Sequence, residues 1–192
     1  MVHGTFPQST ISTRAALPTK DKAIIGLVLA FTAVALTLEL YWVIFNQEME
    51  SRSDLFARAL AIYWPADYTY RVPGYPIEKA FTLSLERVNS LLTPILSALL
   101  IWAILTRKRY RYPLQLTIAT YTCYGTFLYF SVAHISGYAV FEYESAYTYL
   151  MFYLTNLPWL VGYGWIGWDA YREIVRGQRT RSWVGRHVVP DG

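Results

Sequence analysis

Four long apolar runs alternate with shorter polar segments along the chain, and they predict its principal helices. The runs occupy residues 23–45, 81–105, 114–133 and 149–168. A helix needs about 20 mostly apolar residues to cross the hydrocarbon core of a bilayer, and each run supplies them. The pattern therefore predicts an all-α fold, an integral membrane bundle of four transmembrane helices. The short link "RKRYRYP" makes the second and third helices antiparallel neighbours.

The segments around these runs suggest how the chain is organised. Residues 1–20 are rich in Ser and Thr, and we expect a disordered cytosolic leader. The membrane domain then covers residues 21–174, and residues 175–192 form a basic cytosolic tail. The first run is too long for a cleaved signal, so we expect it to be retained. The link 46–80, rich in Pro, Tyr and Trp, is predicted to be an ordered cap over a cavity mouth.

Composition and charge support the membrane interpretation. The 192 residues are 54% hydrophobic and only 16% charged, which is unusual for a soluble domain. The cations in the leader, the second link and the tail are Arg14, Lys20, Lys22, Arg107, Lys108, Arg109, Arg111, Arg172, Arg176, Arg179, Arg181 and Arg186. The link 134–148 has none and carries Glu142 and Glu144. The positive-inside rule therefore places both termini in the cytosol.

The basic tract "TRKRYRY" has two interpretations. It could bind nucleic acid, or it could set the topology and contact lipid headgroups. We favour the second interpretation because the cations segregate by side of the membrane. The expected partners are therefore membrane lipids, with no nucleic acid.

Two acidic residues interrupt the apolar runs. Glu39 lies within "VALTLELYWVIF" and Glu86 within "SLERVNSLLTPILSALL". An ionisable side chain at bilayer depth is costly, so it normally faces protein or a wet cavity and marks a functional site. Glu86, Asn89 and Thr93 follow an i, i+3, i+7 spacing, which places them on one helical stripe. We expect both glutamates to face one cavity.

Comparable polar and aromatic stripes mark the third and fourth runs. Their members are Thr117, Tyr121, Tyr124, Asn156, Trp159 and Tyr163. A structural explanation stays open for each of these residues, because Asn and Thr often join helices by hydrogen bonds and Tyr and Trp often anchor span ends. For Glu39 and Glu86, the alternative to a functional role is a structural pairing with Arg87 or with a tyrosine.

The two glutamates suit acid/base chemistry. In one low-dielectric cavity one carboxyl can stay protonated and donate while the other accepts. The face of Trp159 can stabilise a transient cation. The sequence has no P-loop, glycine fingerprint or metal-ligand spacing, and its single cysteine is Cys123, so we expect no cofactor, no metal and no disulfide framework. His134, in "SVAHISG", is either a satisfied rim residue or part of the site.

The segments "YGTFLYFSVAHISG" and "FYLTNLPWLVGYGWIGWDA" resemble the emopamil-binding protein family, which includes sterol 8,7-isomerases and EXPERA-domain proteins. The resemblance runs over residues 23–174. It implies a helical bundle in the endoplasmic reticulum membrane, with a cavity that holds a sterol or a cationic amphiphile. It also implies a reaction that protonates a ring alkene, forms a tertiary cation and removes a neighbouring proton.

The resemblance also assigns residues. It makes Glu39 and Glu86 the catalytic, proton-handling pair, while Asn156 and Trp159 line the cavity and Asn89 replaces a cavity threonine. The substrate-binding residues that we predict are Asn89, Tyr121, Tyr124, His134, Asn156, Trp159 and Tyr163.

The chain departs from the sterol isomerases at three positions. Ala35 stands where those enzymes carry a histidine one turn before the first glutamate. Thr126 and Ala133 replace two acids that the resemblance leads us to expect.

Three functions are consistent with these residues. The first is a membrane isomerase that shifts a double bond in a sterol, or in a similar hydrophobic polycyclic or isoprenoid substrate, by proton transfer. In a close variant, protonation triggers cyclisation or rearrangement in a specialised-metabolite pathway. The second is a non-catalytic sterol or lipid binder that assists another membrane protein. The third is a scaffold that binds no small apolar ligand. A homodimer is compatible with each.

Overall fold

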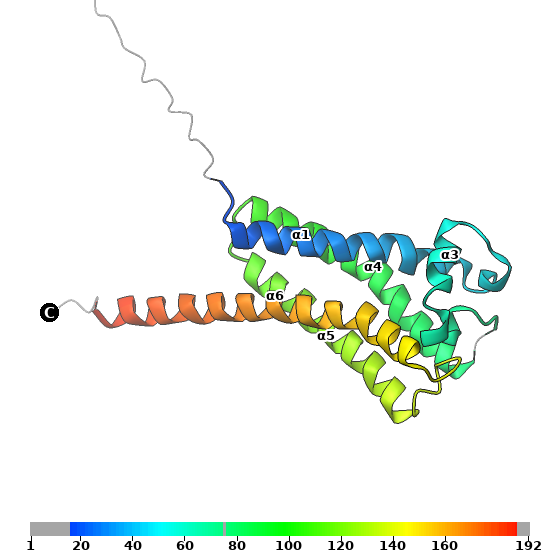
Figure 1. The fold of residues 1–192 in the computed structure, drawn as a ribbon. Coiled ribbons are helices and arrows are strands. Elements are labelled where there is room, and N and C mark those ends of the chain that lie inside the picture. Colours follow the sequence, from blue (N-terminus) through cyan, green and yellow to red (C-terminus); the bar gives the residue numbers. More distant parts are fainter. Residues whose placement is uncertain (1–15, 75, 188–192) are drawn as a thin grey trace, which may run out of the picture.

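The computed structural model describes residues 16–74 and 76–187, with side chains up to residue 177. Within these residues the chain is helical and contains no strand (Figure 1). The elements in chain order are α1 (Thr19–Val34), the π-helical η1 (Ala35–Glu39), α2 (Leu40–Phe45), the short 3-10 helix η2 (Met49–Ser51), α3 (Leu55–Ala61), the 3-10 helices η3 (Trp64–Ala66) and η4 (Tyr68–Tyr70), α4 (Ile77–Leu105), α5 (Arg111–Ile135) and α6 (Ala146–His187). The prediction of an all-α fold is confirmed for this part of the chain.

Two helical stretches are long and apolar enough to cross a membrane. They are Thr19–Phe45, in which α1, η1 and α2 form one continuous helix, and Ile77–Leu105, which is α4. The third and fourth predicted runs lie within α5 and α6, which carry more Tyr, Thr and Gly. Length and composition therefore support two of the four predicted membrane helices, and four crossings stay a prediction.

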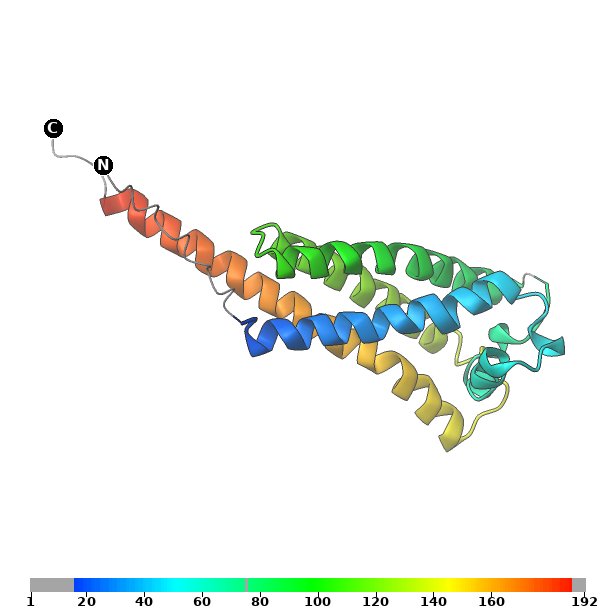
Figure 2. The ribbon, with the colours of Figure 1, turned by 90° about the horizontal axis from the view of Figure 1, so that it is seen from above.

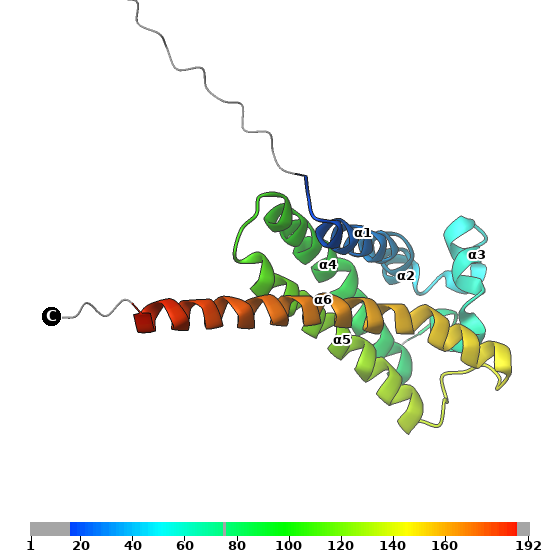
Figure 3. The ribbon, with the colours of Figure 1, turned by 60° about the vertical axis from the view of Figure 1, so that its left-hand side comes forward.

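Successive long helices run in alternating directions (Figures 1 and 2). The start of α1, the α4–α5 link and the start of α5 lie at one end, and α6 projects beyond the other helices on that side (Figure 2). At the opposite end, residues 46–74 form a cap of α3 and short 3-10 turns beside the end of α2 (Figure 3). The cap is tied to the α5–α6 link, because Tyr68 N donates to Val140 O over 2.9 Å and Glu142 N donates to Pro65 O over 3.0 Å.

Two glycines allow α6 to approach its neighbours closely. A Cβ at Gly167 would lie 2.9 Å from the Cβ of Ala119 on α5, and a Cβ at Gly162 would lie 2.8 Å from the ring of Phe31 on α1. Small residues permit such close helix packing inside membranes. The apolar core of the bundle then forms between the four long helices, with Ile24, Val28, Leu100, Ile104, Ile118 and Ile166 fully buried.

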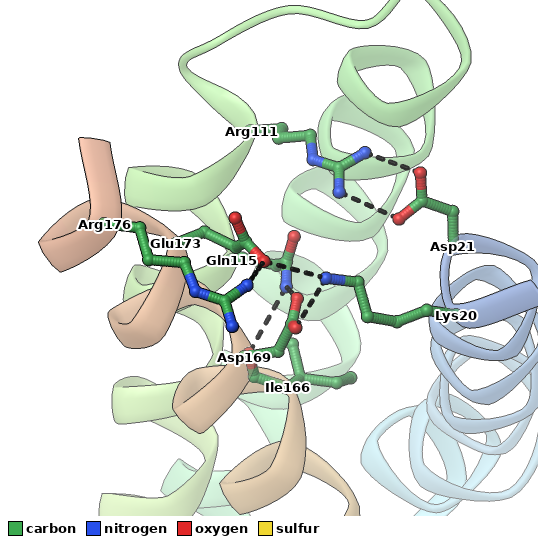
Figure 4. A network of polar contacts seen from close by, with 8 residues as sticks. All are labelled: Lys20, Asp21, Arg111, Gln115, Ile166, Asp169, Glu173 and Arg176. Atoms are coloured by element: carbon green, nitrogen blue, oxygen red, sulfur yellow. Dashed lines mark hydrogen bonds and ion pairs between the residues drawn. The ribbon is translucent and has the colours of Figure 1, made fainter. Parts of the chain in front are cut away.

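A network of charged side chains, which we call the clasp, joins α1 to α5 and α6 (Figure 4). Arg111 donates two hydrogen bonds of 2.8 Å to Asp21, and both residues are buried, at 7% and 5% exposed. Lys20 pairs with Asp169 at 2.8 Å and with Glu173 at 3.2 Å. Arg111, which the sequence grouped with the topology charges, therefore lies in an internal ion pair.

Breaking the clasp should destabilise the bundle. Arg111→Met leaves the Asp21 carboxylate buried without its partner, and loss of one member of a buried pair costs about 3–5 kcal/mol of unfolding free energy. The measurement is chemical unfolding in detergent micelles. The double variant Asp21→Asn/Arg111→Met should lose less than the sum of the single variants. Arg109→Met, in the same link but exposed, is the control, and equal stabilities for Arg111→Met and Arg109→Met would contradict the expectation.

Candidate functional site

A cavity of two lobes lies between the helices and the cap. The inner lobe has a volume of about 50 Å³ and the outer lobe about 410 Å³. Glu39, Glu86, Asn156 and Trp159 line both lobes. The rest of the outer lobe is mostly apolar. Its apolar residues come from α1, η1, α3 and the residue after it, and α6: Phe31, Val34, Leu38, Ala59, Leu60, Ile62, Met151 and Pro158. Its volume falls within the range of small-molecule sites, about 300–1,000 Å³.

Glu39 is the last residue of η1, the π-helical segment in the middle of the first long helix. Single π turns are rare and occur frequently at functional sites, because the extra residue changes the direction of the following side chains. The carboxyl group enters the cavity from this turn, and the residue is only 9% exposed. Its Oε2 atom is buried and has no hydrogen-bond partner among the described residues.

Glu86 enters the same cavity from α4, and its Oε2 atom, like that of Glu39, is buried without a hydrogen-bond partner among the described residues. The hydroxyl of Tyr70, in the cap, donates to its Oε1 atom. Asn89, one turn further along α4, and Glu39 line the inner lobe together with this carboxyl group. The two predicted catalytic residues are therefore brought together, with a tyrosine and an amide on the side of Glu86 alone.

Aromatic rings form one wall of the cavity. The rings of Phe31 and Trp159 stack with centroids 4.4 Å apart, and Tyr163 stacks on Phe31 at 5.1 Å. Gly162 makes room for the Phe31 ring. Asn156 donates to the hydroxyl of Tyr63 over 3.1 Å and so connects this wall to the cap.

The cap contributes a third buried carboxyl group. Asp67 accepts hydrogen bonds at Oδ1 from the backbone N–H and the hydroxyl of Thr69, at 2.9 and 2.5 Å. Its Oδ2 accepts from the hydroxyl of Tyr129 at 2.5 Å, and that hydroxyl lies 2.9 Å from the hydroxyl of Tyr63. Burial raises the pKa of Asp67 to about 6, although these hydrogen bonds act in the opposite direction. A polar chain therefore runs from Asp67 to Asn156 in the cavity wall.

The other predicted substrate-binding residues lie away from the cavity lining. Tyr163 is buried beneath the aromatic wall, and Tyr121 lies behind Asn89, to which its hydroxyl donates. Tyr124 is 63% exposed on the outer face of α5. His134 is exposed, and its Nε2 atom lies 3.1 Å and 3.2 Å from the hydroxyls of two tyrosines at the end of the bundle that carries the cap.

The three positions that differ from the sterol isomerases have different surroundings. Ala35 is fully buried at the start of η1 and lines neither lobe. Thr126 lines the inner lobe, and its hydroxyl donates to the backbone carbonyl of Thr122 over 3.0 Å. Ala133 is buried in an aromatic cluster near the cap.

Sequence reasoning missed Tyr63, Asp67, Tyr70 and Tyr129. The first three lie in the irregular cap, where no helical spacing aligns them with the glutamates. Tyr129 shares a face of α5 with Thr122 and Thr126 and lines the inner lobe with them. The cluster of Tyr and Trp in residues 63–70 was the available signal, and it indicated only an ordered cap.

A helical bundle with two helices apolar enough to cross a membrane, and a cavity whose outer lobe is apolar and holds two carboxyl groups, is consistent with a membrane protein that binds hydrophobic ligands. The family model described as EXPERA (EXPanded EBP superfamily) matches residues 55–170, more than half of the chain. The chain belongs to this family, and the resemblance seen in the sequence is confirmed. The matched residues include Glu86, Asn156 and Trp159 and exclude Glu39. A search of curated proteins finds no match.

The titration of Asp67 should appear in the pH dependence of stability. Its pKa is about 6 in the folded protein and about 3.9 in an unfolded chain, so the folded state holds the proton more tightly. The contribution of Asp67 to stability is therefore full below about pH 4 and is lost as the pH rises through about 6. Relative to Asp67→Asn, the protein should lose on the order of 3 kcal/mol of unfolding free energy between pH 4 and pH 7.

Thermal unfolding of both proteins at a series of pH values measures this difference. Asp54→Asn is a control of opposite sign. Hydrogen bonds, first from Tyr41, lower the pKa of Asp54 to about 2, so its contribution is present above about pH 4 and lost on acidification. Parallel stability curves for the protein and Asp67→Asn would contradict the expectation.

Proposed function

We propose that this protein is a membrane isomerase of the emopamil-binding protein type. It shifts a double bond in a sterol, or in a similar hydrophobic polycyclic or isoprenoid substrate, by acid/base proton transfer. The observation that carries this proposal is the meeting of Glu39 and Glu86, from separate helices, in one cavity whose outer lobe is largely apolar. A hydrophobic substrate and the membrane lipids are the partners, with no cofactor.

The unequal hydrogen bonding of the two acids supports a division of roles. Glu86 accepts a hydrogen bond from the Tyr70 hydroxyl, which favours its carboxylate form and suits it to act as the base. Asn89, one turn away, lines the inner lobe with it. The Oε2 atoms of both carboxyl groups are buried without a hydrogen-bond partner among the described residues, so the Tyr70 donor at the Oε1 atom of Glu86 is what distinguishes the two acids.

The reaction then needs no oxidant or reductant. The O–H bond of Glu39 breaks as its proton forms a C–H bond with one alkene carbon, using the π electron pair, and a tertiary cation results. Glu86 removes a proton from the neighbouring carbon, and the electrons of that C–H bond form the new double bond. Because the two carboxyl groups interact, the proton can return from Glu86 to Glu39. The ring of Trp159, which lines both lobes, stabilises the cation.

The proposed setting is a bundle of four transmembrane helices in the endoplasmic reticulum with both termini in the cytosol. The described start of α1 and the described end of α6 lie on the same side of the bundle, which supports this topology (Figure 1). The cations of the α4–α5 link lie on that side as well, as the positive-inside rule requires of a cytosolic face.

Ala35 favours a second candidate, a proton-triggered cyclase or rearrangement enzyme with the same cavity and acids. Its buried methyl group supplies no proton relay beside Glu39. The same observation is compatible with a non-catalytic sterol or lipid binder. The two enzymes require Glu39 and Glu86 to transfer protons, and the binder does not.

Isosteric amides separate these functions. Yeast that lacks its own sterol 8,7-isomerase would express the protein, and mass spectrometry would profile the sterols. Restored 7-unsaturated sterols are expected. Glu39→Gln and Glu86→Gln should each lower turnover at least about a hundredfold, because neither amide can transfer the proton, while ligand binding is retained.

Glu50→Gln, which changes an exposed acid in the cap, is the matched control and should leave turnover unchanged. Full turnover in both active-site variants would refute the acid/base roles. Persistent 8-unsaturated sterols, with folded protein in the membrane, would exclude sterol isomerisation and favour another substrate or a binding role.

A further inference from the structure

Behind Glu86, a row of polar side chains connects α4 with α5. The hydroxyl of Tyr121 on α5 donates to the Oδ1 atom of Asn89 over 2.6 Å. The hydroxyl of Thr93, which is fully buried on α4, lies 3.4 Å from the Tyr121 hydroxyl. Asn89 lines the inner lobe, whereas Tyr121 does not. Tyr121 therefore contacts a residue of the cavity lining without lining the inner lobe itself.

These contacts have a direction. The phenol proton of Tyr121 is used on the Asn89 oxygen, so the Thr93 hydroxyl is the donor in its own contact with Tyr121. An amide has an accepting oxygen and a donating NH₂ group, and the phenol occupies the oxygen. The part of Asn89 left for Glu86 is the NH₂ group. Donors therefore point in sequence from Thr93 through Tyr121 to Asn89, and the NH₂ group of Asn89 is left for the inner lobe that Glu86 also lines.

An asparagine needs such a partner because its side chain can rotate by half a turn. The rotated amide would present its oxygen to Glu86, and two accepting oxygens in a low-dielectric cavity repel each other. A threonine in place of Asn89 would not need the partner, because its hydroxyl can donate without an imposed orientation. Tyr121 thus matters only as long as residue 89 is an asparagine.

We propose that Tyr121 is a positioning residue that fixes the amide of Asn89 so that its NH₂ group faces Glu86. The consequence for turnover rests on the proposed function, in which Glu86 is the base. Tyr121 itself does not contact the substrate. The orientation of Asn89 is a property of the protein alone, so it can be tested without a substrate.

Infrared spectroscopy of the purified protein provides that test. The carboxyl bands of Glu86 are assigned as the signal that Glu86→Gln removes. Tyr121→Phe keeps the ring and deletes the hydroxyl, and it should move these bands, as should Asn89→Ala. Tyr124→Phe, an exposed tyrosine on the same helix, should leave them in place. Unmoved Glu86 bands in Tyr121→Phe would overturn the proposal, whatever the activity.

Turnover provides a second test, in which the Asn89→Thr variant should remove the effect of Tyr121→Phe. Tyr121→Phe should lower kcat about tenfold, because it removes the hydrogen bond that holds the Asn89 amide in place, with KM nearly unchanged. In the Asn89→Thr background the same change should have no further effect. An equal loss in both backgrounds would overturn the proposal by showing that the Tyr121 hydroxyl acts independently of Asn89. If the protein turns over no sterol, the proposed function fails, and the infrared bands still decide the orientation of Asn89.

Discussion

The burial of two carboxyl groups in one cavity, whose outer lobe is largely apolar, is the constraint on which the rest of this structure depends. Apolar surroundings disfavour an unpaired carboxylate, so each acid needs either a proton or donors. The cap brings the Tyr70 hydroxyl to Glu86, and α4 places Asn89 in the inner lobe that Glu86 also lines, whereas the Oε2 atoms of both acids have no hydrogen-bond partner among the described residues. The π turn, the cap and the α4–α5 contact therefore all contribute to one electrostatic arrangement.

The helices were largely predictable because their apolar runs are long and regular. The second run, predicted for residues 81–105, lies wholly within α4. The first turn of α4 contains Glu78 and Lys79, so the apolar pattern does not include it. The sequence did not predict how far α6 extends beyond its apolar run, because a basic sequence can continue a helix without any apolar stripe. The Asp21–Arg111 pair joins residues far apart in the chain, and helical periodicity carries no information about such contacts.

The site was predictable only where its members share a helix. Glu86 and Asn89 lie one turn apart on α4, and their spacing alone placed them on one face. The meeting of Glu39 with Glu86 required an assumption about how the helices pack. Asp67 and Tyr129 are 62 residues apart, and Asp67 lies in a cap of short irregular turns, so no local pattern linked them. Tyr124 lies on the stripe that the sequence suggested, but its side chain is exposed and does not line the cavity.

The length of α6 has a practical consequence for anyone handling this protein. At 1.5 Å per residue, the helix rises about 42 Å between Trp159 in the cavity wall and His187. That distance exceeds the hydrocarbon thickness of about 30 Å. The C-terminal part of α6 therefore acts as a stalk beyond the bundle (Figure 2). An affinity label or fluorescent protein attached there would be held well away from the cavity and would leave its mouth open to ligands.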